Sequence, residues 1–190
     1  GRFNKDQLVG MKKGYITDWK ISDETFVGVH SDQQWWQHYY SNGVTISGIF
    51  DIEFKLPPVP SGTYEIRLGY TVNPERGVVQ AYLNNKPCGI PVDLRMYGTD
   101  PNIGWIEDTE DEEENIANDK AMHNRGYMKG MDCYRQWDSD HTLRANTNNL
   151  RRILFTQYLD SEETYKLRYR QVLDDPECYL SSNFIELCPK

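Results

Sequence analysis

The sequence lacks the short motifs that mark most hydrolases and metal-dependent enzymes. Neither HExxH nor GxSxG occurs, and the four histidines are scattered along the chain. His123 and Cys133 could serve as base and nucleophile in principle, but two unrelated loop residues are the better interpretation. A chain this acidic always offers two carboxyl groups for glycoside hydrolysis, and their separation is invisible in the sequence. We therefore expect no enzyme activity, with an acidic-pair hydrolase as the alternative.

Cysteine is scarce and is not clustered. The four cysteines are widely spaced and form no CxxC pair: Cys88, Cys133, Cys178 and Cys188. This spacing disfavours a zinc knuckle. Two disulfides and four free thiols both fit it, so cysteine usage does not indicate the redox compartment.

Long apolar runs and an excess of basic charge are absent as well. No stretch approaches the roughly 20 apolar residues that a membrane-spanning helix needs. The 21 Lys and Arg residues against 29 Asp and Glu residues give a net charge of -8. No basic face is therefore expected to neutralise the phosphates of a nucleic acid. The opening GRFNKDQ carries no signal peptide, and we interpret the chain as a piece excised from a longer protein.

The sequence is rich in period-two alternation of apolar and polar residues, which predicts β-strands. The alternating segments are 46–56, 63–72, 78–83, 90–94, 150–159, 164–173 and 179–187. The first four are joined by short polar connections, which indicates an antiparallel meander or part of a jelly roll. Seven strands at this spacing predict an all-β, two-sheet antiparallel sandwich in one domain over residues 1–190.

Two regions lie outside this pattern: an aromatic-rich lead-in at 1–45 and an insertion at 95–149. Within the insertion, 112–122 has helix character, with acidic residues at its start and Lys120 and His123 toward its end, as a helix dipole favours. Gly126 and Gly130 then end the helix, and no strand is predicted around them. The acidic residues at 107–114 lack the D-x-D-x-D-G spacing of a calcium loop. A solvated segment is the better interpretation, and no cofactor is expected.

The run GIFDIEFKL to GIPVDL at 48–94 and the ending NFIELCP at 183–189 resemble β-sandwich domains in surface lipoproteins of Bacteroidetes. Those domains accompany fasciclin domains and are similar to galactose-binding, carbohydrate-module jelly rolls. DKAMHNRGYMKG at 119–130, followed by LRRIL, also resembles a recurrent block of that family. Ser182 and Asn183 stand where the family pattern has an acidic residue, which puts a ligand or calcium role there in doubt. From about residue 30 onward, the resemblance implies an extracytoplasmic, lipid-anchored binding or adhesion module whose partner is a glycan or a cell-surface or matrix protein.

Two groups of residues are candidates for ligand binding. In WWQHYY at 35–40, exposed rings of Trp36 and Tyr40 could stack on sugar faces, and filling of the core is the alternative. In the insertion, Asp119, Asn124 and Arg125 could bind hydroxyl groups. Tyr127 could stack on a sugar ring. The alternative is that the charges of this block pair with the acidic run before it.

These observations together predict a non-catalytic module that binds glycans through loops and aromatic residues. A structural or adhesive spacer is the alternative, in which the insertion covers a sheet edge that would otherwise pair with other chains.

Overall fold

The computed structural model describes residues 16–20, 27–30, 43–47, 49–132, 134–135 and 138–190. The elements within these residues are β1 (Ile16–Lys20), β2 (Val27–His30), β3 (Gly43–Ser47), β4 (Asp51–Lys55), β5 (Gly62–Thr71), β6 (Val78–Leu83), β7 (Lys86–Asp93), α2 (Glu112–Asn124), β8 (Tyr127–Lys129), β9 (Tyr134–Arg135), β10 (Asp138–Thr142), the 3-10 helix η1 (Leu143–Ala145), β11 (Asn149–Leu159), β12 (Lys166–Gln171) and β13 (Tyr179–Pro189).

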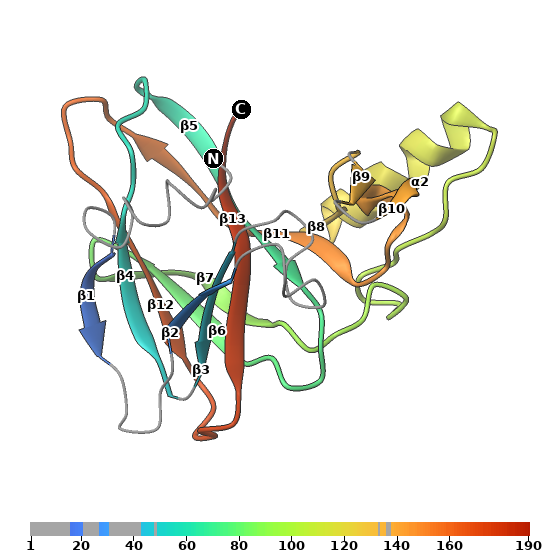
Figure 1. The fold of residues 1–190 in the computed structure, drawn as a ribbon. Coiled ribbons are helices and arrows are strands. Elements are labelled where there is room, and N and C mark those ends of the chain that lie inside the picture. The colour runs from blue at the N-terminus through green and yellow to red at the C-terminus, as the bar shows by residue number, and fades with distance from the viewer. Residues whose placement is uncertain (1–15, 21–26, 31–42, 48, 133, 136–137) are drawn as a thin grey trace.

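Two antiparallel sheets face each other and form a sandwich (Figure 1). One has the strand order β1-β4-β12-β6-β7, and the other has the order β2-β3-β13-β5-β11-β8. The chain changes sheet from β3 to β4, from β4 to β5, from β5 to β6, and again on each side of β12. The predicted all-β two-sheet sandwich is therefore confirmed, with a jelly-roll type of alternation between its sheets.

Of the two arrangements expected for residues 46–94, an antiparallel meander or part of a jelly roll, the meander is wrong, because β3 and β4, β4 and β5, and β5 and β6 belong to different sheets. Between β4 and β7, the described strands that pair with a sequence neighbour are β6 and β7. The single strand predicted at 46–56 is also divided. β3 ends at Ser47 and β4 begins at Asp51, and Phe50 is buried where the chain crosses between the sheets. Side-chain alternation does not reveal such a crossing, since strands of either sheet of a sandwich alternate with the same period.

The core lies between the two sheets. On β5, Ile66, Leu68 and Tyr70 are fully buried, and they belong to one apolar cluster with Val79 of β6 and Leu167 of β12. Burying each such side chain stabilises the fold by roughly 1.5–3 kcal/mol. The opposite face of β5 carries Glu65 and Arg67, as the alternation predicts.

The hairpin between β6 and β7 turns at two asparagines. Asn84 and Asn85 have φ values of 47° and 64°, the left-handed conformation that two-residue hairpin turns of the primed types require. Asparagine tolerates this conformation better than most residues because its short amide bonds locally to the backbone. The connection between the predicted strands at 78–83 and 90–94 is thus shorter than expected, because β7 begins already at Lys86.

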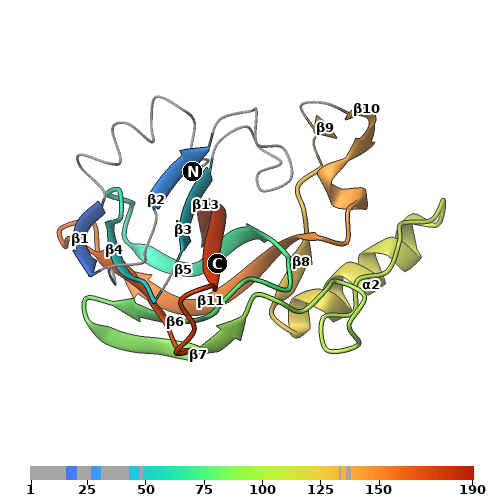
Figure 2. The same cartoon turned by 60° about the horizontal axis from the view of Figure 1, so that its bottom comes forward.

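The predicted insertion lies between β7 and β11, and it contains the predicted helix. Asp111 caps α2, and its carboxylate accepts hydrogen bonds from the backbone of Glu113 and Glu114 at 3.0 and 3.1 Å. Gly126 has a φ of +84°, the conformation that ends many helices. Met122 is the one buried residue of the helix. α2 is therefore held mainly at its C-terminal end, and Figures 1 and 2 both show it projecting to one side of the sandwich, beside β8.

The expectation that residues around Gly126 and Gly130 form no strand is wrong. β8 (Tyr127–Lys129) pairs with β11, with Lys129 opposite Leu150 and Tyr127 opposite Arg152. Three residues between two glycines are too few to show a period, and the partner strand lies more than 20 residues further on. β8 is the edge strand of its sheet, so the insertion covers the edge that β11 would otherwise present.

Candidate functional site

A cleft of about 270 Å³ lies where the insertion meets the outer face of the six-stranded sheet. Four elements contribute its lining: α2, β8, η1 and β11. The residues are Asp119, Lys120, His123, Met128, Lys129, Arg144 and Arg151. The cleft therefore depends on the docking of the insertion against the sandwich.

Lys129 is buried in this cleft, with 3% of its surface exposed. Its Nζ lies 2.5 Å from Asp108 Oδ1 and 3.4 Å from Asp119 Oδ1, and 5.5 Å from the centre of the Trp105 ring. A buried ammonium group is costly unless it is paired, and here two carboxylates and an aromatic face compensate it. These contacts fasten β8 to the segment before α2 and to the helix itself.

Arg144 of η1 joins the same two aspartates. Its Nη2 lies 2.8 Å from Asp108 Oδ1 and 2.8 Å from Asp119 Oδ2. Hydrogen bonds from Arg144, together with those from Lys129, lower the pKa of Asp108 although its partial burial acts in the other direction. Among the described residues, Nη1 of Arg144 has no hydrogen-bond partner.

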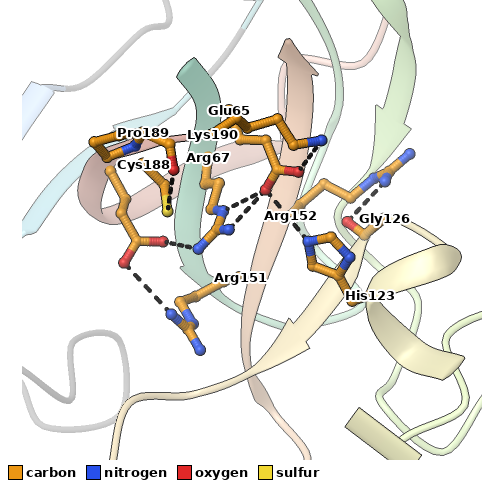
Figure 3. Close-up of polar contacts among 10 residues, drawn as sticks. Glu65, Arg67, His123, Gly126, Arg151, Arg152, Cys188, Pro189 and Lys190 are labelled. Atoms are coloured by element: carbon orange, nitrogen blue, oxygen red, sulfur yellow. Dashed lines mark hydrogen bonds and ion pairs between the residues drawn. The ribbon is translucent and has the colours of Figure 1, made fainter. Parts of the chain in front are cut away.

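Glu65 of β5 forms a second charged centre, which contacts the cleft residue His123 (Figure 3). Its carboxylate is 3% exposed and lies 2.6 Å from Arg67, 2.9 Å from Lys190 and 3.3 Å from His123. Burial by itself would raise the pKa of Glu65, but the hydrogen bonds from Lys190, Arg67 and His123 outweigh it and lower the pKa to about 2. The ionised carboxylate links the end of α2, the centre of the sheet and Lys190.

Arg151 of β11 connects the two centres. Its Nε donates to the carbonyl of Lys129 at 2.9 Å, and its Nη1 lies 3.4 Å from Glu186, which also pairs with Arg67 at 3.0 Å. Figure 3 shows Arg151 at the side of this network that faces away from Glu65. Among the described residues, Nη2 of Arg151 has no partner. The guanidinium is thus held in position by two contacts and retains an unused donor.

Of the residues predicted to bind a ligand, Asp119 lines the cleft. Asn124 and Arg125 lie at the C-terminal end of α2, exposed and outside the lining. Arg125 Nη1 donates to the carbonyl of Ala121 at 3.1 Å, so its guanidinium folds back along its own helix. Trp36 and Tyr40 lie outside the described residues.

Tyr127 has a different position from the one its predicted stacking role requires. The side chain is 7% exposed, and the guanidinium carbon of Arg152 lies 4.5 Å from the ring centre. Arg152 is held over the ring by its hydrogen bond to the carbonyl of Gly126, at 2.8 Å. One face of the phenol ring is therefore already covered by a cation, and the ring belongs to the apolar core cluster.

Sequence reasoning did not assign a binding role to Arg144 or Arg151, because both lie outside the block at 119–132. A signal was present for Arg151. It stands in the predicted strand 150–159 directly after Leu150, which is fully buried. Because successive side chains of a strand point to opposite faces, Arg151 points to the outer face of the sheet. The alternative that insertion charges pair with the acidic run is seen at one position, Asp108 with Lys129.

Within the described residues, no three His, Cys, Asp or Glu side chains lie close enough together to hold a metal ion. The same part of the chain contains no helix that is both long and apolar enough to cross a membrane. Cys88, Cys178 and Cys188 are free thiols, and Cys133 lies outside the described residues.

No protein-family model matches the chain, and no curated protein matches it. Among solved structures, a Paenibacillus xanthan lyase is similar to it, with a TM-score of 0.51 and 11% sequence identity. The match covers 92% of this chain and 12% of the lyase chain. At this identity the likeness shows a shared fold.

Proposed function

We propose that this chain is a non-catalytic module that binds a glycan in the cleft between α2, β8, η1 and β11. The observation that supports this best is the cleft itself, in which fixed polar side chains keep unused donors. Nη1 of Arg144 and Nη2 of Arg151 are such donors, and each guanidinium is already held by other contacts. Preorganised donors of this kind bind hydroxyl or carboxylate groups without a large loss of side-chain freedom.

The setting proposed for the module is extracytoplasmic. The support is the resemblance to lipid-anchored surface domains and the sandwich that the chain shares with part of a polysaccharide lyase. Under this proposal the partner is a glycan at a cell surface, and the module supplies binding to a larger protein.

The non-catalytic assignment is supported by the state of the carboxyl groups. Among the described residues, the carboxyl groups whose pKa is shifted are Glu65, Asp93 and Asp108, and cationic neighbours lower the pKa of each. A general acid for glycoside hydrolysis needs the opposite, a carboxyl whose pKa is raised so that it holds its proton near neutral pH. These three groups are suited to ion pairing and poorly suited to proton donation.

Affinity electrophoresis in gels that contain single polysaccharides tests the proposal. We expect the protein to be retarded by at least one polysaccharide, and the Lys120→Ala variant to be retarded less, because Lys120 lines the cleft. Lys86→Ala is the matched control. Lys86 is also an exposed lysine, but it is the first residue of β7, in the other sheet. A folded protein that no polysaccharide in a broad panel retards would contradict the proposal.

A second candidate function is supported by the position of β8. Because β8 extends the six-stranded sheet at β11, the insertion occupies an edge that could otherwise pair with another chain. A structural spacer built in this way needs no ligand. It predicts that Lys120→Ala changes neither stability nor any binding, and that removing the insertion causes self-association.

A further inference from the structure

We infer that the glycan bound in this cleft is acidic and carries a carboxylate or sulfate group; this inference rests on the proposed function. A neutral glycan, which offers hydroxyl groups, would be bound by a mixture of hydrogen-bond donors and acceptors, whereas this cleft has more cationic side chains than anionic ones. Three properties of the cleft favour an anion: its lining is basic, some of its donors have no partner among the described residues, and its cations outnumber its carboxylates.

The lining is basic in a chain that is acidic overall. Four of its seven residues are lysine or arginine, a fifth is histidine, and Asp119 is the one acidic member. The whole chain has 29 acidic residues against 21 basic ones. A local reversal of this kind focuses a positive potential at the cleft and favours entry of an anion.

The excess persists when the residues behind the lining are counted. The cations are Lys120, Lys129, Arg144, Arg151, Arg67 and Lys190, and the carboxylates that pair with members of this set are Asp108, Asp119, Glu65 and Glu186. Among the described residues, six positive charges against four negative ones leave a surplus of two before any charge on His123. One more acidic group in the cleft would reduce this surplus.

The surplus can be assigned to particular groups. Lys120 is exposed on α2 and has no ion pair among the described residues. Arg151 shares Glu186 with Arg67, and its own contact is the longer one, 3.4 Å against 3.0 Å. With Nη1 of Arg144, these residues provide donors on α2, β11 and η1, so an anion in the cleft could be approached from three sides. Lys129, in contrast, has its charge shared by two aspartates and serves as a fixed part of the floor.

Binding of two pairs of polymers tests the inference by calorimetry on the full chain. Polygalacturonate is compared with its fully methyl-esterified form, and dextran sulfate with dextran, so that each pair differs in its anionic group. Lys120→Gln and Arg151→Gln are the test variants and Lys86→Gln is the control, each checked for folding by its melting curve. We expect binding of at least one anionic polymer, no binding of its neutral counterpart, and about tenfold weaker binding by each test variant.

The outcomes separate the inference from the function on which it rests. Binding that weakens steeply between about 0.05 M and about 0.5 M salt, with Lys86→Gln unchanged, supports the acidic ligand. Equal binding of charged and neutral polymers overturns the inference and leaves glycan binding intact. An equal loss in Lys86→Gln and Lys120→Gln overturns the assignment to this cleft, since it shows adsorption of polyanions by the whole surface. No binding of any polysaccharide, including a neutral panel, overturns the proposed function itself.

Discussion

Replacing Glu65 by Gln should make the protein less stable at neutral pH and less sensitive to acid. The carboxylate of Glu65 is buried and accepts contacts from Arg67, Lys190 and His123. Glutamine has nearly the same size, but it provides no negative charge for these three neighbours. Arg67, which is 13% exposed, would then keep Glu186 as its remaining ion-pair partner. Loss of one partner of a buried pair costs more than the pair itself contributes, because the other charge stays buried.

The magnitude follows from the pKa of Glu65. The folded-state pKa of about 2 lies below the ordinary value of 4.5, so the stabilising contribution is present above pH 4.5 and is lost as the pH falls toward 2. The difference corresponds to about 3 kcal/mol of unfolding free energy. Lys190 and His123 are 50% and 39% exposed, and solvent screens their part of it. We therefore expect a loss of about 1–2 kcal/mol at pH 7.

Urea unfolding at pH 7 and at pH 3 measures this effect. More than half of the Glu65 contribution is lost at pH 3, so the wild type should lose stability between the two pH values by roughly 1 kcal/mol more than the Glu65→Gln variant. Asp93→Asn is the control. The pKa of Asp93 is also lowered, chiefly by Arg95, but both side chains of this pair are substantially exposed, and a change below about 1 kcal/mol is expected. An identical acid sensitivity of wild type and Glu65→Gln would refute the reasoning, because it would show that the pKa of Glu65 is not depressed.

Two further predictions concern the insertion. Lys129→Met should lower the unfolding free energy by about 2 kcal/mol, because it leaves Asp108 and Asp119 with Arg144 as their remaining cation among the described residues. Urea unfolding measures this loss. Unchanged stability would show that these carboxylates do not hold the buried ammonium group. Asp111→Ala should weaken α2 by about 1 kcal/mol because two backbone donors lose their cap, and amide exchange should become faster in the first turn of α2 while the strands stay protected.

Much of the fold could be predicted from the sequence because each sheet strand buries one face. The segment 78–83 coincides with β6, where buried and partly exposed side chains alternate without interruption. The segment 150–159 falls within β11 (Asn149–Leu159), although burial does not alternate strictly along that strand. Which strands share a sheet could not be predicted in the same way. β4 and β5 both point apolar residues into one core from opposite sides, and such a pattern is identical for neighbours in a sheet and for partners across a sandwich.

The candidate site was harder to predict from the sequence, because the charged residues that contact one another there lie far apart along the chain. The alternation of β5 places Glu65 on the outer face, but its burial results from Lys190 and His123, which lie far along the chain. Asp108 and Lys129 were both visible as charged insertion residues, and their pairing was an open alternative. Tyr127 shows the converse error. A tyrosine between charged residues in a supposed loop indicates an exposed ring, whereas pairing of β8 with β11 turns it into the core.

The two interpretations of the insertion, sheet-edge cover and ligand-binding wall, depend on the same geometry. β8 must pair with β11 to bring Lys129 under α2, and the ion pairs of Lys129 and Arg144 with Asp119 then hold the helix against the cleft. Covering the edge therefore produces the cleft as a consequence. What the cover alone does not require is a cleft lysine, Lys120, that has no carboxylate partner among the described residues. Lys120 lines the cleft, and under the proposed function we expect its substitution to weaken binding of an acidic ligand and to leave the sheet edge intact. Substitution of Lys129 would disturb both.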